Sequence, residues 1–201
     1  MLHADLALAR RLEATEARCN VSFVEARAQL HPGSGAEWQR VAGTTLLFDT
    51  PDSPLTQTFG LGLFEEITAD DLARMEAFFA ARQAPVLHEV SPLAAPALLP
   101  LLLGRGYQPI EYTNVLVLNL ADLPASPPTT ALSTRVITPA EADDWACTAA
   151  AGWLPEAPGL EVFLGEMGQL TARSAGMVPF VAEIDGQAIA TGSLFLGEGV
   201  A

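Results

Sequence analysis

Lysine is missing from this 201-residue sequence, in which all ten basic residues are arginine. A chain without lysine has no side-chain amine for a Schiff base, no anchor for pyridoxal phosphate and no P-loop lysine. Cysteine is scarce as well, since only Cys19 and Cys147 occur, far apart and without metal-ligand spacing. The three scattered histidines form no metal-ligand pair either. We therefore expect a cytoplasmic protein with two reduced thiols and no metal site.

Positive charge and long hydrophobic runs are also scarce. The sequence has ten arginines and 24 acidic residues, and its formal net charge is −14. Such a chain repels phosphate backbones and anionic lipid, so we expect neither nucleic acid nor a membrane as a partner. The charge suits a cationic ligand such as an amine, although an acidic surface that only keeps the chain soluble explains it too. The longest apolar run, Leu93 to Leu103, contains two prolines and is too short to cross a bilayer.

The first 120 residues show a pattern typical of a mixed α/β fold. We expect a helix over 2–17, helical structure that continues up to His31, and strands over 37–42, 44–48 and 56–62. After these we expect a helix from Thr68 to the residue before Pro85, a strand over 86–90, a helix over 92–103 and a strand over 112–120. The last of these is apolar on both faces, which predicts a strand buried on both sides of a sheet. The early strands should be antiparallel and the later ones linked by helical crossovers, which together give a mixed sheet.

A second pattern follows the proline-rich segment 121–131, which reads as a semi-rigid linker. We expect a strand over 131–137, a helix that Thr138 caps, a second helix around 160–170, and a hairpin of 178–184 with 187–196 that turns at Asp185 and Gly186. The predicted organisation is therefore one domain over 1–120, a linker over 121–131, and a second, incomplete domain over 132–201.

Three segments together resemble the GNAT superfamily of N-acyltransferases. The hairpin Val181–Gly192 is similar to the central hairpin of that family. The run Leu103–Tyr107 is similar to the Arg-Gly-Tyr turn that links its last helix to its last strands. The capped helix at Thr138 follows a strand directly, as the first helix of the family does. The chain resembles a tandem member, with a degenerate GNAT-like domain followed by the first part of a second one.

The resemblance implies an N-acetyltransferase that moves an acetyl group from acetyl-CoA to a small-molecule or peptide amine, without a metal. In the family, a Gln/Arg-x-x-Gly-x-Gly/Ala loop before a helix holds the pyrophosphate of acetyl-CoA. The second domain stops before that loop, so one interpretation is a truncated form without activity. In the first domain the equivalent place holds Gly60 and Gly62, but Glu65 and Glu66 stand nearby where an anion would bind. Gly60 and Gly62 are the cofactor-binding candidates.

The resemblance also implies roles for three residues of the second domain. Glu183 is the candidate general base, and the alternative is a solvent-facing strand residue. Trp153 and Glu156 lie between the two helices, where an aromatic ring and a carboxylate would bind an amine, and the alternative is that Trp153 covers the edge of the core.

The sequence is also compatible with two non-catalytic functions. One is a non-catalytic GNAT-like module that binds a partner, or a second copy in a homodimer, through the open strand edge of the unfinished sheet. The other is a small-molecule binding domain that keeps the cleft but not the transfer of an acyl group.

Overall fold

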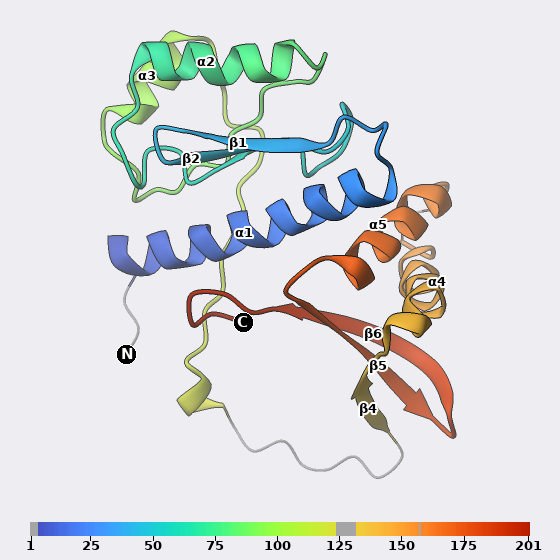
Figure 1. Cartoon of the computed structure of the whole chain (residues 1–201). Coiled ribbons are helices and arrows are strands. Elements are labelled where there is room, and N and C mark those ends of the chain that lie inside the picture. The colour runs from blue at the N-terminus through green and yellow to red at the C-terminus, as the bar shows by residue number, and fades with distance from the viewer. Residues whose placement is uncertain (1–3, 124–131, 157) are drawn as a thin grey trace.

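The computed structural model describes residues 4–123, 132–156 and 158–201, and this part of the chain has an α+β fold (Figure 1). It contains five α-helices and two separate antiparallel sheets, each of three strands. The combination of helices and strands is confirmed. The expected single mixed sheet in the first unit is wrong. Among the described residues, the later part of that unit is joined to the antiparallel strands by one parallel bridge only, between Thr58 and His88.

The first helix, α1 (Leu6–Leu30), is one continuous helix of 25 residues that covers most of the stretch predicted to be helical. The side chain of Asp5 caps it by accepting a hydrogen bond of 2.8 Å from the backbone N–H of Leu8. Its buried face packs against the first sheet through a small apolar cluster. The members of this cluster are Ala17, Val21, Val24, Leu47 and Phe59. The helix therefore covers one face of that sheet.

The first sheet consists of β1 (Glu37–Val41), β2 (Thr44–Phe48) and β3 (Thr58–Phe59), in that order. The predicted strand over 56–62 is much shorter in the structure. Gly60 and Gly62 take φ angles of +76° and +70°, which lie in the left-handed region and end an extended strand. A turn therefore follows β3 where the sequence predicted the rest of the strand.

Two helices cover the other face of this sheet. Helix α2 (Ala69–Ala80) begins after its predicted N-cap, Thr68, and a capping box closes its first turn, in which Thr68 and Asp71 bond to each other's backbone N–H groups. Helix α3 (Leu98–Gly104) begins six residues later than predicted, because the residue before Pro96 is disfavoured in helical geometry. Together they close the main core. Its buried members are Val41, Leu46, Phe48, Leu61, Ile67, Leu72, Met75, Phe78, Phe79, Leu98 and Leu102.

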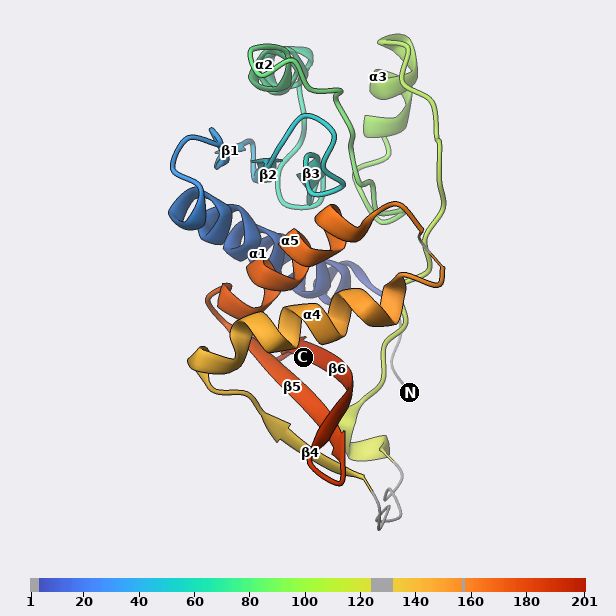
Figure 2. The same cartoon turned by 90° about the vertical axis from the view of Figure 1, so that its right-hand side faces the viewer.

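The predicted strand over 112–120 is wrong as a buried element. The chain after α3 runs in an extended path without a sheet partner, and a short 3-10 turn, η1 (Leu120–Asp122), follows it (Figure 2). The side chains of Tyr112 and Leu116 are 89% and 92% exposed. A strand that is apolar on both faces is buried only when other strands pair with its edges, and no described strand does so here.

The second unit agrees closely with its predicted elements. Strand β4 (Ser133–Val136), the 3-10 turn η2 (Pro139–Glu141) and helix α4 (Ala142–Trp153) follow each other, then α5 (Glu161–Arg173), β5 (Met177–Ile184) and β6 (Gln187–Phe195). The sheet order is β4-β5-β6, with every pair antiparallel. The predicted capping box at Thr138 and the turn at Asp185 and Gly186 are both present. Trp145 ties α4 to this sheet by donating a 2.7 Å hydrogen bond to the carbonyl of Phe180.

Helix α1 lies between the two units, with the first sheet on one side and α5 on the other (Figures 1 and 2). Arg27 of α1 forms an ion pair with buried Asp49, and its Nη1 lies 3.4 Å from a carboxylate oxygen of Glu166 on α5. Thr15 donates a 3.2 Å hydrogen bond to the carbonyl of Gly197. The two units are thus joined by packing as well as by the chain. Most of the predicted linker, 124–131, lies outside the described residues.

Candidate functional site

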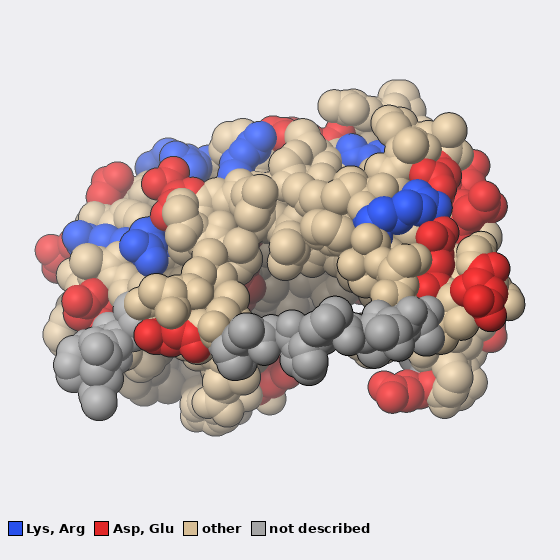
Figure 3. All heavy atoms as spheres, turned by 90° about the horizontal axis from the view of Figure 1, so that it is seen from below, with Lys and Arg blue, Asp and Glu red and all other residues tan. Residues whose placement is uncertain are grey.

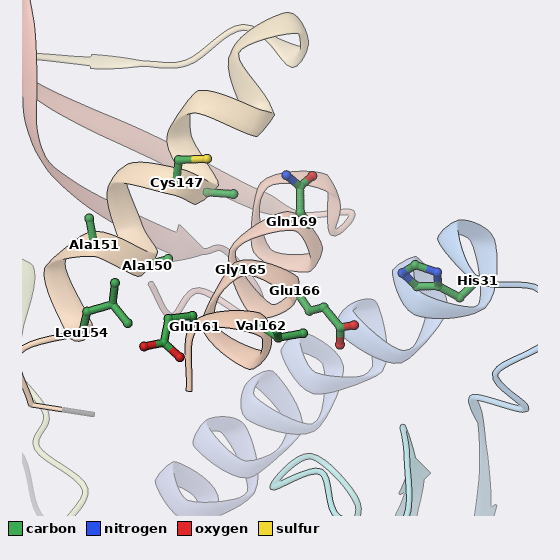
Figure 4. A pocket seen from close by; sticks show the side chains of 11 residues that line it. His31, Cys147, Ala150, Ala151, Leu154, Glu161, Val162, Gly165, Glu166 and Gln169 are labelled. Carbon is green, nitrogen blue, oxygen red and sulfur yellow. The ribbon is translucent and has the colours of Figure 1, made fainter. Parts of the chain in front are cut away.

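A groove of about 540 Å³ lies between α4, α5 and the C-terminal end of α1 (Figure 4). Two glycines of α5 explain why it exists. A Cβ on Gly168 would lie 2.9 Å from Cα of Ala146, so the two helices touch there. One turn earlier, a Cβ on Gly165 would meet no atom within 4 Å, so the helices are separated at that level. Close contact at one turn and a gap at the next leave a cavity of the size that small ligands occupy.

The walls of the groove are apolar and its polar groups are few. Its apolar lining consists of Ala146, Ala150, Ala151, Leu154, Val162 and Gly165. Its polar lining consists of His31, Cys147, Glu161, Glu166 and Gln169. Most of these residues lie along α4 and α5, and His31 stands at the end of α1 (Figure 4). An apolar cavity with a few polar groups suits a ligand that has a hydrocarbon body and one charged end.

The charge of these groups is negative. The guanidinium of Arg27 is shared between Asp49 and Glu166, so one positive charge faces two carboxylates. Glu161, in the first turn of α5, accepts a 3.2 Å hydrogen bond from the N–H of Gly159. In the part of the chain that the structure describes, no arginine is within ion-pair distance of Glu161. A cation bound here would meet carboxylates that the protein itself does not fully neutralise.

Trp153 and Glu156 lie next to the groove but do not line it. Trp153 is the last residue of α4 and is 60% exposed. Glu156 is exposed in the following loop, where its N–H donates a 3.0 Å hydrogen bond to the carbonyl of Trp153. Leu154, between them in the sequence, does line the groove. The two predicted residues therefore stand beside one end of the cavity, in reach of a ligand that projects from it.

Glu183 lies apart from the groove, in an ion-pair cluster on the second sheet. Arg135 Nη2 is 2.8 Å from an oxygen of Glu183 and 2.7 Å from an oxygen of Glu141. Hydrogen bonds from Arg135 and Thr138 lower the pKa of Glu141 to about 2. The carboxylate of Glu183 is therefore occupied by the guanidinium of Arg135 and does not line the groove.

The turn at Gly60 and Gly62 does not fit the pyrophosphate of acetyl-CoA. The N–H of Gly60 donates its hydrogen bond to a carboxylate oxygen of Glu13, at 2.9 Å. A Cβ on Gly60 would lie 2.7 Å from the ring of Phe64, and one on Gly62 would lie 2.9 Å from Leu98. Side chains of the protein thus fill the space that a backbone cradle leaves for phosphate oxygens.

A second cavity, of about 460 Å³, lies against this turn. Glu65 and Glu66 line it together with one arginine, Arg10. The Nε of Arg10 already donates a hydrogen bond of 2.6 Å to the carbonyl of Leu63. Two carboxylates repel an anion, and the one guanidinium nearby is already hydrogen-bonded. This cavity therefore does not suit the pyrophosphate of acetyl-CoA either.

Glu13 is a feature of this turn that the sequence did not indicate, because 47 residues separate it from its hydrogen-bond partner Gly60. Burial raises the pKa of Glu13 to about 7, against the lowering effect of the Gly60 N–H. The nearby carboxylates of Glu89 and Glu16 raise it further. Glu13 is thus a carboxyl group that titrates near neutral pH inside the first unit.

Replacing Glu13 with glutamine should remove a pH dependence of stability. The folded protein holds this proton more tightly than the unfolded chain, so stability falls as pH rises from about 4.5 to about 7 and then levels off. The amide oxygen of glutamine can still accept from Gly60. We expect Glu13→Gln to be about 1–2 kcal/mol more stable than the wild type at pH 8 and unchanged at pH 4, the size being reduced by partial exposure. Urea unfolding at both pH values measures it, with exposed Glu111→Gln as the matched control; equal gains at both pH values would contradict the assignment.

Comparison with known proteins gives no match: none to a protein family, none to a curated protein and none to a solved structure. Within residues 4–123, 132–156 and 158–201, no group of three His, Cys, Asp or Glu side chains is placed to hold a metal ion. The helices of these same ranges include none that is both long and apolar enough to cross a membrane.

Proposed function

We propose that this chain is a GNAT-type N-acyltransferase scaffold that binds an amine acceptor in the groove between α4 and α5. The observation that carries the proposal is the groove itself, an apolar cavity of about 540 Å³ that has Glu161 and Glu166 among its lining residues. The carboxylates would attract the ammonium group of an amine, and the apolar walls would bury its hydrocarbon body. Acetylation of such an amine is the reaction that the family resemblance implies.

The topology of the second unit supports the same proposal. Helices α4 and α5 are inserted between β4 and β5, and the three strands are antiparallel in the order β4-β5-β6. A strand, two helices and an antiparallel hairpin form the opening of the GNAT fold that the sequence resembles. We also propose that the protein acts in the cytoplasm, where isolated thiols such as Cys147 stay reduced.

The described residues provide the acceptor side of this activity. Glu161 and Glu166 would hold the ammonium form of the amine, and the apolar walls would exclude water from its body. Trp153, beside the groove, would cover the part of the ligand that projects from it. Because the Gly60 turn does not fit acetyl-CoA, these residues account for binding of the amine and not for transfer of the acetyl group.

Calorimetry with phenethylamine, followed by mass spectrometry of mixtures that also contain acetyl-CoA, tests the proposal. We expect heat on addition of the amine, and none with 2-phenylethanol, which has the same body without the charge. Formation of N-acetylphenethylamine would support the transferase. No heat at millimolar phenethylamine would contradict the proposed acceptor site.

A second candidate function is a non-catalytic amine-binding module. The observation that favours it is the hydrogen bond from the N–H of Gly60 to Glu13, which occupies the backbone donor that a cofactor would need. For this candidate we expect the same heat with phenethylamine, no N-acetylphenethylamine, and no heat with acetyl-CoA alone. Heat with acetyl-CoA alone would contradict it.

A further inference from the structure

The segment between α3 and η1 has the composition of a central strand but pairs with no strand (Figure 2). Six of its large apolar side chains are between 41% and 92% exposed. They are Ile110, Tyr112, Val115, Leu116, Val117 and Leu118. The backbone groups of 108–118 form no backbone hydrogen bond with other described residues. Exposed apolar groups in this number, on a backbone with free donors and acceptors, indicate a surface that another strand covers.

The free edge of β6 complements this segment. Strand β6 pairs with β5 along one edge, and no described strand pairs with its other edge. Native edge strands are usually short or protected by charge or proline. Strand β6 has nine residues, Gln187–Phe195, with no charged residue and no proline among them. Ile189 and Leu194 on it are about half exposed, at 50% and 46%.

We propose that residues 112–120 of one copy add as a strand to the free edge of β6 in a second copy of this chain. The two stretches match in length and in their lack of charge, and both expose apolar side chains. Each copy carries one donor segment and one acceptor edge, so a two-fold axis creates two identical pairings and closes the assembly as a dimer. This inference is independent of the amine site, because it rests on other residues.

The charge distribution fits such an assembly. With a net charge of −14, two copies repel each other wherever acidic surfaces meet. The sequence from Tyr112 to Leu120 has no charged residue, and neither has β6. Seen from below, the middle of the molecule shows few charged side chains, and acidic ones gather toward its ends (Figure 3). Pairing through uncharged strands brings two acidic copies together at little electrostatic cost.

Light scattering at high micromolar concentration tests the dimer on the full chain. We expect twice the monomer mass for the wild type. Val117→Pro removes a backbone donor from the segment and should weaken association at least about 100-fold. Because 108–118 form no backbone hydrogen bond within the described chain, this variant should keep the circular dichroism spectrum and the melting temperature of the monomer.

Three further samples make the test specific. Ile189→Lys places a charge on the acceptor edge and should also give a monomer. Leu99→Glu is the matched control, because the side chain of Leu99 on α3 is 55% exposed. This variant should remain a dimer. A mixture of Val117→Pro and Ile189→Lys should regain a dimer weaker than that of the wild type, because one of the two pairings joins an intact edge to an intact segment.

Two results would overturn the proposal. A wild-type monomer would do so, including one in which the amides of 113–119 resist hydrogen exchange because the segment folds onto its own chain. A dimer of unchanged affinity in Val117→Pro would show that another surface holds the copies together.

Discussion

Replacing Arg27 with methionine is expected to lower the free energy of unfolding by about 3–5 kcal/mol. The side chain of Arg27 is only 7% exposed and that of Asp49 is fully buried, and the two form an ion pair. The second carboxylate oxygen of Asp49 has no hydrogen-bond partner in the described structure. Without Arg27, a carboxylate would remain in the interior without a cation, and Glu166 would lose its link to α1. Urea unfolding of the variant and the wild type gives the difference.

Two controls separate the ion pair from the loss of a large side chain. Arg40→Met, at an exposed position of β1, should change the free energy of unfolding by less than about 0.5 kcal/mol. The double variant Arg27→Met/Asp49→Leu should recover most of the stability, because it buries no unpaired charge. A loss below about 1 kcal/mol in Arg27→Met would contradict the role assigned to this pair.

Gly165→Leu is expected to abolish amine binding, with an affinity at least about 100-fold below that of the wild type. A side chain at Gly165 meets no atom within 4 Å and enters the groove directly. The fold should tolerate it, and removing a glycine from the interior of α5 should raise stability by roughly 0.5–1 kcal/mol. Calorimetry with phenethylamine and thermal unfolding together show whether binding is lost while stability is gained.

Gly152→Leu is the matched control for this experiment. Gly152 also lies in a helix and also has no atom within 4 Å of an added Cβ, but it does not line the groove. This variant should bind phenethylamine as the wild type does. Equal loss of binding in both variants, or wild-type binding by Gly165→Leu, would place the amine elsewhere.

Much of the fold could be predicted because its signals are local. The N-cap at Thr68, the capping box at Thr138 and the turn at Asp185 and Gly186 each depend on a few neighbouring residues, and all three are present. The prediction of a buried strand over 112–120 was wrong because its outcome depends on a distant partner. The apolar pattern of this segment predicts a buried strand, but burial requires a partner edge, which no pattern within the segment specifies.

The candidate site was harder to predict than the fold. The family resemblance led to Trp153 and Glu156, which lie beside the groove, whereas Glu183 is held by Arg135 elsewhere. The groove depends on contact at Gly168 and a gap at Gly165, and on the end of α1 that brings His31 to the same place. Such convergence of three helices has no signature in the sequence, and neither has the bond between Glu13 and Gly60.

The most direct test of the amine site measures how fast a maleimide alkylates Cys147, which lines the groove and is exposed. The other thiol, Cys19, reacts slowly because burial raises its pKa to about 11, so the two rates separate. Millimolar phenethylamine should slow the alkylation of Cys147 several-fold, and 2-phenylethanol at the same concentration should leave it unchanged. Alkylation of Cys147 at one rate with and without phenethylamine would contradict an amine site in this groove.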